Sequence, residues 1–290
     1  MPDVEDAVAR LRAEWGLDFA RVRRVLAGAG RGESLTGLVT ASGLPRRDVE
    51  MVLAALPEPF PEMALESRSG IDEQDLTGRM EELAKGLPPS RWGLDHVPAT
   101  PDTMARRAQH LAGEYELGGA SVLCLGDHDL TSLAVGSLEP GAELSVVDID
   151  EPILDHIGES AAGLGLTVTS AWADLRLALP PSLTGSADLV FTDPPYTTEG
   201  MRLFLGRALE ALRPTGHERI AFCFGTGERH LVKALEVQGL LGELRLALEA
   251  MLPGFNRYTG AEAIGARSDL YICRPTKGAR VGEAPRRTGR

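Results

Sequence analysis

The sequence has few cysteines, few aromatic residues and no long apolar run. Its 290 residues include 3 cysteines and 5% aromatic side chains. Cys124, Cys223 and Cys273 lie in apolar segments without metal-ligand spacing, so we expect buried thiols in a reducing compartment. No apolar stretch is long enough to span a membrane, and the acidic start, Met1-Pro2-Asp3, lacks a signal-peptide pattern. The sequence therefore predicts a cytoplasmic protein.

Basic residues are also scarce. Lys and Arg number 30 against 42 Asp and Glu, which gives a net charge of -12. This balance argues against a protein that binds the phosphate backbone of a nucleic acid. It agrees with a cationic small-molecule partner such as a polyamine, although acidity alone also keeps a protein soluble. The hydrophobic share of 43% is ordinary for a globular chain, and the length allows one or two domains.

The first third of the chain has helical periodicity. Apolar side chains recur at helical spacing over residues 1–92, and the turn Ser42-Gly43-Leu44-Pro45 separates the segments 33–39 and 46–56. A helix, a glycine-containing turn and a second helix resemble the helix-turn-helix of winged-helix domains. The second segment has only two basic residues, so we favour dimerisation or covering of the active site over DNA binding.

Changes in composition divide the remainder. Residues 86–101 contain four prolines and two glycines, which predicts an ordered linker, and a helix is expected over 101–116. The last residues are basic and rich in Gly and Pro, which predicts disorder. We therefore expect a helical winged-helix-like domain at 1–92, a Rossmann-like catalytic domain at 93–275 and a tail at 276–290.

Short apolar runs alternate with helical stretches in the middle of the chain, which predicts an α/β fold with a mostly parallel, Rossmann-like sheet. The runs are 121–125, 143–147, 168–173 and 187–192, and acidic residues follow each of them. Ligands on such sheets bind at the carboxyl ends of the strands. These acidic ends therefore predict one negatively charged pocket for a nucleoside with ribose hydroxyls and a cationic substrate.

The first of these ends is the turn Gly126-Asp127-His128-Asp129. A nucleoside site needs glycine here so that the backbone can approach the ligand. The carboxylate of S-adenosylmethionine (SAM) lies near such a turn, and two aspartates would repel it. Decarboxylated SAM lacks that carboxylate and keeps its ammonium, so it suits an acidic turn. The alternative is that Asp127 or Asp129 caps the next helix, although capping does not require both.

The second and third ends carry the remaining predicted nucleoside ligands. Asp148 stands about twenty residues after the glycine turn, the usual place of a ribose-hydroxyl ligand. Asp150 either assists it or forms the N-cap of a helix over 151–161. Asp174 is expected to accept from the adenine amino group, with an exposed cap as the alternative.

The fourth end is Asp193-Pro194-Pro195-Tyr196. Methyltransferases that act on amino groups of adenine or cytosine use this arrangement, in which the acid and a prolyl carbonyl accept hydrogens from the attacking nitrogen. The aromatic ring of Tyr196 would pack on the substrate or make a cation–π contact. The motif therefore predicts a nitrogen nucleophile beside a sulfonium of the SAM type.

Together these residues resemble the branched-chain polyamine synthases, the bis-aminopropyl-spermidine synthase family. The resemblance covers residues 90–275, and Phe255-Asn256-Arg257-Tyr258 is similar to a family loop near the substrate. It implies a class I SAM-methyltransferase-like fold with a winged-helix-like N-terminal domain, a homodimer, and transfer of aminopropyl groups from decarboxylated SAM to an internal nitrogen of spermidine. The family turn reads Gly-Asp-Asp-Asp, whereas this chain has His128 in place of the middle aspartate. That histidine either serves as a base near neutral pH or faces away from the site.

The resulting hypothesis assigns roles to the acidic groups. Asp127, His128 and Asp129 would bind the cation and accept its proton, and Asp193 would orient the acceptor nitrogen while methylthioadenosine leaves. No metal is expected. Glu199 and Glu228 would extend the acidic site along a polyamine, or are simply surface charges.

Asn256 and Tyr258 are expected to contact the substrate from a mobile loop that contains Gly254 and Gly260. Other functions remain open at this point. SAM itself would serve a small-molecule N-methyltransferase, or an enzyme that transfers or cyclises the aminocarboxypropyl arm. A DNA-binding regulator that senses a nucleoside or polyamine is the last alternative, because the net charge opposes it.

Overall fold

We describe a computed structural model of the chain over residues 19–55, 69–94, 96–115, 117–214, 218–225, 231–260 and 266–279. Its centre is a seven-stranded sheet in the order β3-β2-β1-β4-β5-β7-β6. The strands are β1 (Ser121–Leu125), β2 (Glu143–Asp148), β3 (Val168–Trp172), β4 (Leu189–Thr192), β5 (Arg219–Phe224), β6 (Leu246–Arg257) and β7 (Arg267–Pro275). Strands β1 to β5 pair in parallel, and β7 runs antiparallel to both β5 and β6. The predicted Rossmann-like α/β fold is confirmed.

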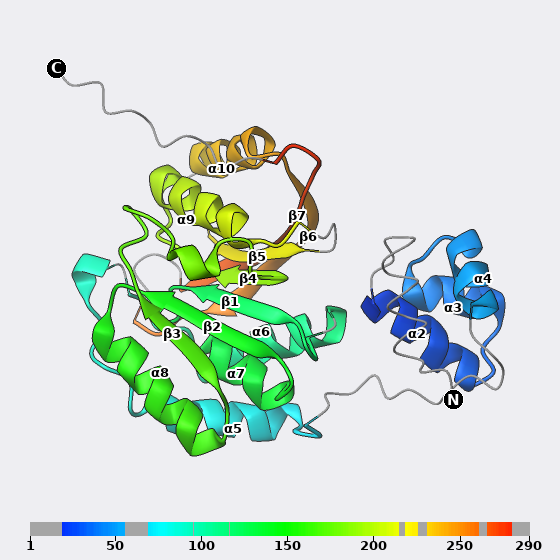
Figure 1. Cartoon of the computed structure of the whole chain (residues 1–290), viewed down its shortest axis with the longest axis horizontal. Coiled ribbons are helices and arrows are strands. Elements are labelled where there is room, and N and C mark those ends of the chain that lie inside the picture. The colour runs from blue at the N-terminus through cyan, green and yellow to red at the C-terminus, as the bar shows by residue number, and fades with distance from the viewer. Residues whose placement is uncertain are drawn as a thin grey trace.

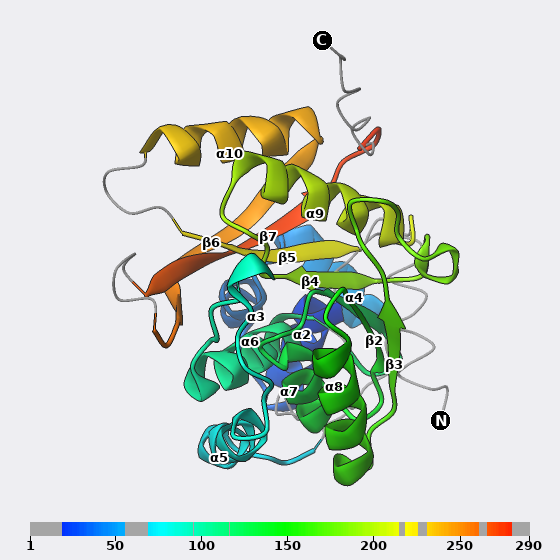
Figure 2. The same ribbon diagram turned by 90° about the vertical axis from the view of Figure 1, so that its left-hand side faces the viewer.

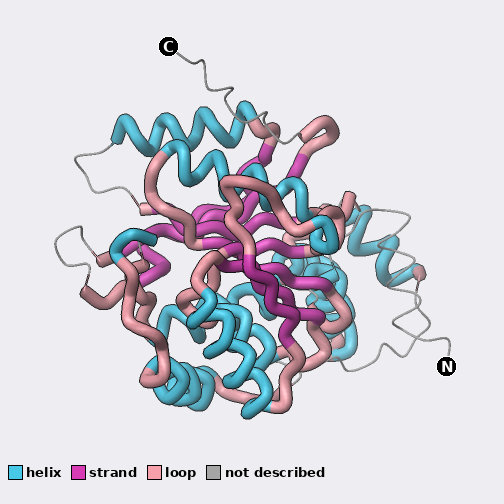
Figure 3. Tube along the Cα trace, turned by 60° about the vertical axis from the view of Figure 1, so that its left-hand side comes forward, coloured by secondary structure: helices cyan, strands magenta, loops and turns pink. Residues whose placement is uncertain are grey.

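Helices cover both faces of this sheet (Figure 2; Figure 3). One face carries α5 (Glu73–Ala84), α6 (Pro101–Glu114), α7 (Thr131–Leu138) and α8 (Glu151–Leu164), and the other carries α9 (Thr198–Ala211) and α10 (Leu231–Glu243). Alternate residues of β1 serve the two faces: Val122 packs with the first group, and Leu123 packs with the second. Because both faces are covered, the central strands are apolar almost throughout.

The strand ends agree with the sequence prediction to within a few residues. β1 has the predicted limits, and β2 extends one residue further, to Asp148. The fourth run was predicted to begin at Ala187, whereas β4 begins at Leu189 and Ala187 forms an isolated bridge with Leu212. The parallel pairing of β2, β1 and β4 brings their carboxyl ends to one edge of the sheet.

The prediction of a mobile loop around Asn256 was wrong. Gly254 and Asn256 lie within β6, and Tyr258 follows directly in an antiparallel bridge with Ala99. The register of β6 against β7 shifts between Leu252 and Asn256. Gly254 has a φ of 59° there, a conformation that suits glycine. Glycine at a bulge of this kind gives the strand the composition of a loop.

The N-terminal helices form a cluster of their own beside the main body (Figure 1). They are α2 (Phe19–Gly30), α3 (Leu35–Ser42) and α4 (Arg46–Ala54). Ser34 caps α3 by accepting from the Gly37 N–H, and Gly43 ends it in the left-handed conformation, as the predicted helix-turn-helix requires. Residues 19–55 contain no strand, so the winged-helix resemblance stays a prediction.

Helix α5 packs with the main body. Its buried Leu76 and Met80 belong to the hydrophobic cluster that also contains Leu111 of α6 and Val135 of α7. We therefore propose that the boundary between the two domains lies between residues 55 and 73, rather than at residue 92. The main body ends with β7 at Pro275, and residues 280–290 of the expected tail lie outside the described part.

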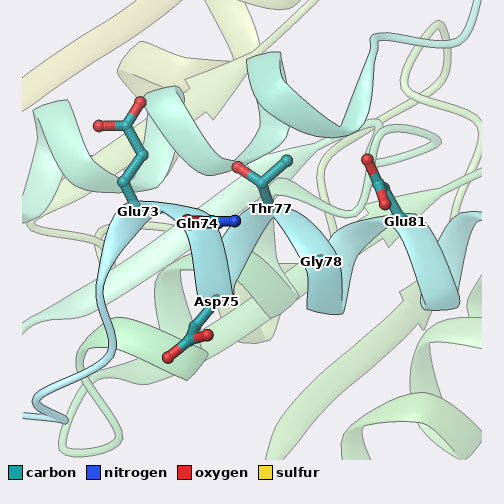
Figure 4. A pocket seen from close by; sticks show the side chains of 6 residues that line it. All are labelled: Glu73, Gln74, Asp75, Thr77, Gly78 and Glu81. Carbon is teal, nitrogen blue, oxygen red and sulfur yellow. The ribbon is translucent and has the colours of Figure 1, made fainter.

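Short 3-10 turns occur at η1 (Trp92–Leu94) and η2 (Pro181–Leu183). Among the described residues, no helix combines the length and the apolar character that a membrane crossing requires. A hollow on the surface of α5 is lined by Glu73, Gln74, Asp75, Thr77, Gly78 and Glu81 (Figure 4). All six residues belong to α5, whereas the acidic residues of the predicted ligand site follow the strands of the sheet.

Candidate active site

Asp148 joins the ends of β1 and β2. It is 5% exposed, and its Oδ2 accepts the Asp127 N–H at 3.1 Å while its Oδ1 accepts the Asp150 N–H at 2.9 Å. Gly126, with φ of 70°, turns the chain out of β1 and donates its N–H to the Val147 carbonyl at 2.8 Å. The structure therefore places the glycine turn directly beside the predicted ribose ligand, which is the arrangement of a nucleoside site.

The carboxylate of Asp127 lies at the N-terminus of α7, as the capping alternative predicted, although the N-cap residue itself is Leu130. The Asp127 carboxylate accepts the Thr131 N–H at 2.8 Å and the Ser132 N–H at 3.1 Å. Burial raises the pKa of Asp127 to about 7, although these hydrogen bonds act to lower it. The helix N-terminus thus holds a carboxyl group that exchanges its proton near neutral pH.

Arg107, which the sequence analysis missed, lies at the centre of the site. Thr100 begins α6 by accepting the Thr103 N–H, and Pro101 occupies the first turn. The arginine falls on the buried face of this helix with Met104 and has no exposed surface. The local signal was an arginine inside the apolar stripe of an amphipathic helix. The adjacent Arg106 obscured that signal, because a pair of arginines normally indicates a solvated face.

The Arg107 guanidinium gathers residues from three other segments of the chain. It donates to Asp129 Oδ2 at 2.8 Å, to Asp193 Oδ2 at 2.5 Å and to Asn256 Oδ1 at 2.8 Å. Its carbon also lies 5.1 Å from the centre of the Phe191 ring, within cation–π range. A buried arginine is tolerated only when its charge is paired and its donors are satisfied, and these contacts do both. Asp129 and Asp193, predicted as separate amine ligands, therefore share one protein cation.

Asp193 is also held by two tyrosines. The Tyr196 hydroxyl donates to its Oδ1 at 3.0 Å, and the Tyr258 hydroxyl donates to its Oδ2 at 2.7 Å. The two hydroxyl oxygens lie 2.7 Å apart, and that of Tyr258 also lies 2.7 Å from Ser268 Oγ. Burial raises the pKa of Asp193, whereas Arg107 and these hydroxyls oppose that rise. Tyr196, predicted to pack on the substrate, thus uses its hydroxyl to hold the aspartate.

The two prolines of the motif lead into α9. Pro194 is buried, and the carbonyl of Pro195 accepts the Thr197 N–H at 2.8 Å. Thr197 then caps α9 by accepting the Gly200 N–H at 3.0 Å. The motif therefore fixes the path of the chain between β4 and α9, and with it the position of Asp193.

The predicted linker before α6 lies over the carboxyl edge of the sheet. The Ala99 N–H donates to Asp129 Oδ1 at 2.8 Å, and the Thr100 N–H donates to the Arg257 carbonyl at 2.9 Å. This path brings His96, a second residue that the sequence analysis missed, against His128. Their ring centroids are 4.3 Å apart with the planes tilted by 37°. His128 is thus packed against another imidazole and is 9% exposed, rather than turned to solvent.

Asp150 begins α8, but its side chain does not cap that helix. Its Oδ1 accepts from Arg91 at 2.9 Å, and its Oδ2 lies 3.8 Å from Nδ1 of His96. The side chain is 1% exposed. Asp150 therefore connects Asp148, the predicted ribose ligand, with the imidazole pair.

The remaining predicted residues lie at the margin of the site or beyond it. Arg176 binds both oxygens of Asp174 and lowers the pKa of Asp174 by these hydrogen bonds. Glu199 is exposed in the first turn of α9, and Glu228 lies outside the described part of the chain. The adenine role of Asp174 and the substrate role of Glu199 stay predictions. Within the described residues, no three His, Cys, Asp or Glu side chains form a group that could hold a metal ion.

The fold and the acidic edge define the class of protein. A solved structure with the same fold is a putative RNA methyltransferase from Pyrococcus horikoshii, with a TM-score of 0.53 and 17% identity over 70% of this chain and 98% of that one. The branched-chain polyamine synthase of Thermus thermophilus, crystallised with N4-aminopropylspermidine and 5'-methylthioadenosine, is similar over 97% of this chain and 96% of that one, with a TM-score of 0.63 and 22% identity. The fold is therefore class I SAM-methyltransferase-like.

The family follows from the sequence comparison. The model of the branched-chain polyamine synthase A C-terminal domain matches residues 75–274, and the chain belongs to that family. An uncharacterized protein of Methanocaldococcus jannaschii is 35% identical over 66% of this chain and 48% of its own length. The N(4)-bis(aminopropyl)spermidine synthase of the same organism is 32% identical over 64% of this chain and 53% of its own length. The chain thus spans about half the length of these curated relatives.

A third relative matches over more of its length. The N(4)-bis(aminopropyl)spermidine synthase of Thermus thermophilus is 31% identical over 88% of this chain and 76% of its own length. The predicted resemblance to the bis-aminopropyl-spermidine synthases is thereby confirmed. It rests on the motifs at the strand ends, which the structure gathers at one edge of the sheet.

Proposed function

We propose that this chain transfers the aminopropyl group of decarboxylated SAM to an amine nitrogen of a polyamine such as spermidine and releases methylthioadenosine. The relatives named as N(4)-bis(aminopropyl)spermidine synthases support this activity. The solved Thermus thermophilus structure holds an aminopropylated polyamine and methylthioadenosine, which are products of such a transfer.

The observation that carries the proposal is the buried negative charge at the carboxyl edge of the sheet. Within the described residues, five aspartates gather there with two arginines, Arg107 and Arg91, as their ion-pair partners. The aspartates are Asp127, Asp129, Asp148, Asp150 and Asp193. The excess of carboxylates favours a ligand with more than one positive charge, and a polyamine beside a sulfonium provides that charge.

The chemistry requires the site to generate a free amine. An alkyl ammonium has a pKa of about 10, so only about one molecule in a thousand is a nucleophile at pH 7. We propose that Asp193 orients the acceptor nitrogen, with Asp127, His128 and Asp129 at the cationic end of the substrate. Gly126, Asp148, Asp150 and Asp174 are proposed to hold the nucleoside. Pro194, Pro195, Tyr196, Glu199, Asn256 and Tyr258 are proposed to shape the acceptor side.

Two measurements test this function. Calorimetric titration compares decarboxylated SAM with SAM, using methylthioadenosine and adenosylhomocysteine as controls. Mass spectrometry then follows incubation with decarboxylated SAM and spermidine. We expect tighter binding of the decarboxylated ligand, a product heavier by one or more aminopropyl groups, and one methylthioadenosine per group. Preferential binding of SAM without aminopropyl transfer would contradict the proposal.

The competing function uses SAM itself. His128 replaces a carboxylate in the turn, so repulsion of the methionine carboxylate is weaker than in a turn with three aspartates. A methylated amine, or one carrying an aminocarboxypropyl group, would identify that activity by its mass. The predicted homodimer and cytoplasmic location stay predictions, and the acceptor is proposed only as a class.

A further inference from the structure

The carboxylates nearest the proposed reaction are already engaged with protein donors. Asp127 accepts two backbone N–H groups of α7. Asp129 accepts the Ala99 N–H and the Arg107 guanidinium, and Asp193 accepts that guanidinium and two tyrosine hydroxyls. Both oxygens of each carboxylate thus already accept hydrogen bonds from the protein. A group whose acceptor atoms are not engaged in this way is better placed to take the ammonium proton.

His128, by contrast, has ring nitrogens that no protein group engages within the described residues. Its side chain is buried between the acidic turn and His96, and neither of its ring nitrogens has a hydrogen-bond partner in the part of the chain that the structure describes. Nδ1 of His96 is buried and likewise unpartnered there. Buried polar atoms are nearly always satisfied in native proteins, so three such atoms in one pair of adjacent imidazoles indicate a place where a substrate or water supplies the partner.

The surroundings suit a group that gains and loses one proton. Burial, together with His128, lowers the pKa of His96, while Asp148, Asp150 and Asp129 act in the opposite direction. Arg91 also lies near this pair, because it binds Asp150, the carboxylate beside His96. Two imidazolium rings at this distance would repel each other, so positive charge on one ring opposes positive charge on the other. Asp150 Oδ2, 3.8 Å from His96 Nδ1, is the carboxylate nearest that proton.

We propose that the His96–His128 pair is the proton acceptor of the transfer reaction, a role that rests on the proposed function. The ammonium of a secondary amine gives one proton to a free imidazole nitrogen. The lone pair released on the amine forms the new C–N bond, the C–S bond breaks, and its electron pair stays on sulfur as neutral methylthioadenosine. The product retains its other hydrogen as a tertiary ammonium, and the imidazolium passes its proton to water.

The test is the pH profile of kcat/KM with decarboxylated SAM and spermidine for the wild type, His128→Gln and His96→Gln. General-base catalysis contributes about 10²–10⁴-fold, so we expect a loss of that size at pH 7 for His128→Gln, together with loss of the fall in rate toward acid pH. His96→Gln is expected to lose activity less and to keep an acid limb at a displaced pH. Calorimetry with methylthioadenosine checks that each variant retains its nucleoside site.

His156→Gln is the matched control. His156 lies on α8, and its Nε2 is 3.1 Å from the Leu83 carbonyl of α5, so this imidazole already has a protein partner. The profile of this variant should match the wild type. A His128→Gln protein that binds methylthioadenosine and keeps the wild-type rate and acid limb would overturn the proton-acceptor role while leaving aminopropyl transfer intact. A wild type that makes no aminopropyl product at any pH overturns both proposals.

A second measurement is independent of the variants. Proton NMR of the histidine ring C–H signals follows the imidazole pair in the wild type from pH 5 to pH 8. We expect the midpoint of proton uptake by the pair to coincide with the acid limb of kcat/KM. Separate midpoints overturn the proposal even if the substitution at His128 prevents folding.

Discussion

Nη2 of Arg107 lies 2.5 Å from Oδ2 of Asp193, and the arginine side chain has no exposed surface. A helix that precedes the sheet in sequence thereby holds the aspartate that follows β4. The contact gives Asp193 a fixed direction before any substrate arrives, which is the condition for orienting an acceptor nitrogen. It also makes the geometry of the site depend on a buried ion pair.

Replacing Arg107 by methionine is expected to destabilise the protein strongly. The substitution leaves Asp129 and Asp193 buried without their cation, and breaking a buried pair costs about 3–5 kcal/mol. Urea unfolding at pH 7 measures this free energy. Arg46→Ala is the control, because its ion pair with Glu50 is exposed and should matter little. Equal stability of the two variants would show that Arg107 does not hold the site together.

Asp193→Asn is expected to abolish turnover while leaving nucleoside binding largely intact. The amide keeps one oxygen acceptor but loses the charge that orients the acceptor nitrogen, and a loss of about 10²–10⁴-fold in kcat/KM follows. The Asp193 side chain binds Arg107 and the tyrosines, whereas the nucleoside is assigned to the ends of β1 and β2. Methylthioadenosine affinity by calorimetry provides the comparison. Glu159→Gln, at an exposed position of α8, should keep full activity; retained activity of Asp193→Asn would remove that residue from the mechanism.

Tyr258→Phe is expected to cost more stability than Tyr196→Phe. The Tyr258 hydroxyl contacts Asp193, Ser268, Tyr196 and Arg107, whereas that of Tyr196 contacts Asp193 and Tyr258. Leaving buried polar atoms without partners costs about 1–3 kcal/mol each. Urea unfolding of both variants under the same conditions decides the order. An equal or reversed order would mean that Ser268 and Arg107 find other partners.

Asp127 is expected to make stability depend on pH. The native state binds a proton up to about pH 7, whereas the unfolded chain releases it near 3.8, because burial raises the pKa of this group. Stability from Asp127 is therefore greatest below the unfolded value and falls as the pH rises from about 4 to 7. The full change corresponds to about 4 kcal/mol at 1.36 kcal/mol per pH unit.

The comparison with Asp127→Asn isolates this effect. The wild-type unfolding free energy, minus that of the variant, should fall between about pH 4 and pH 7 in urea titrations and level off above that range. Asparagine keeps one oxygen to accept from the N-terminus of α7, so the variant should still fold. A difference that rises with pH would mean that the hydrogen bonds to Thr131 and Ser132 outweigh burial and keep the carboxylate ionised.

The parts of the fold that follow local rules were predictable from the sequence. The limits of β1 and the acidic residues after β1, β2 and β4 could be found because apolar runs end at polar side chains. Parallel pairing of the strands then places those ends at one edge of the sheet, independently of the exact limits of the helices. The capping role of Asp127 was one of two stated alternatives, and the structure assigns it.

The parts that depend on long-range contacts could not be found in this way. Arg107 meets partners between 22 and 151 residues away, and periodicity within α6 contains no information about them. Asn256 was placed in a loop because glycine in a bulge has the local signature of a turn. His96 lies in a proline-containing segment. The position of this segment depends on the bridge between Ala99 and Tyr258, a long-range contact that the local sequence does not indicate.

The distance along the chain between Arg107 and Asn256 has a consequence for biosynthesis. The two residues are 149 positions apart, and Asn256 in turn donates to Ser268 of β7. A ribosome therefore completes most of the sheet before the guanidinium can meet its last partners, and contacts of such long range form slowly. The catalytic edge is expected to close only after the final hairpin emerges, so an interrupted translation product would lack a finished site.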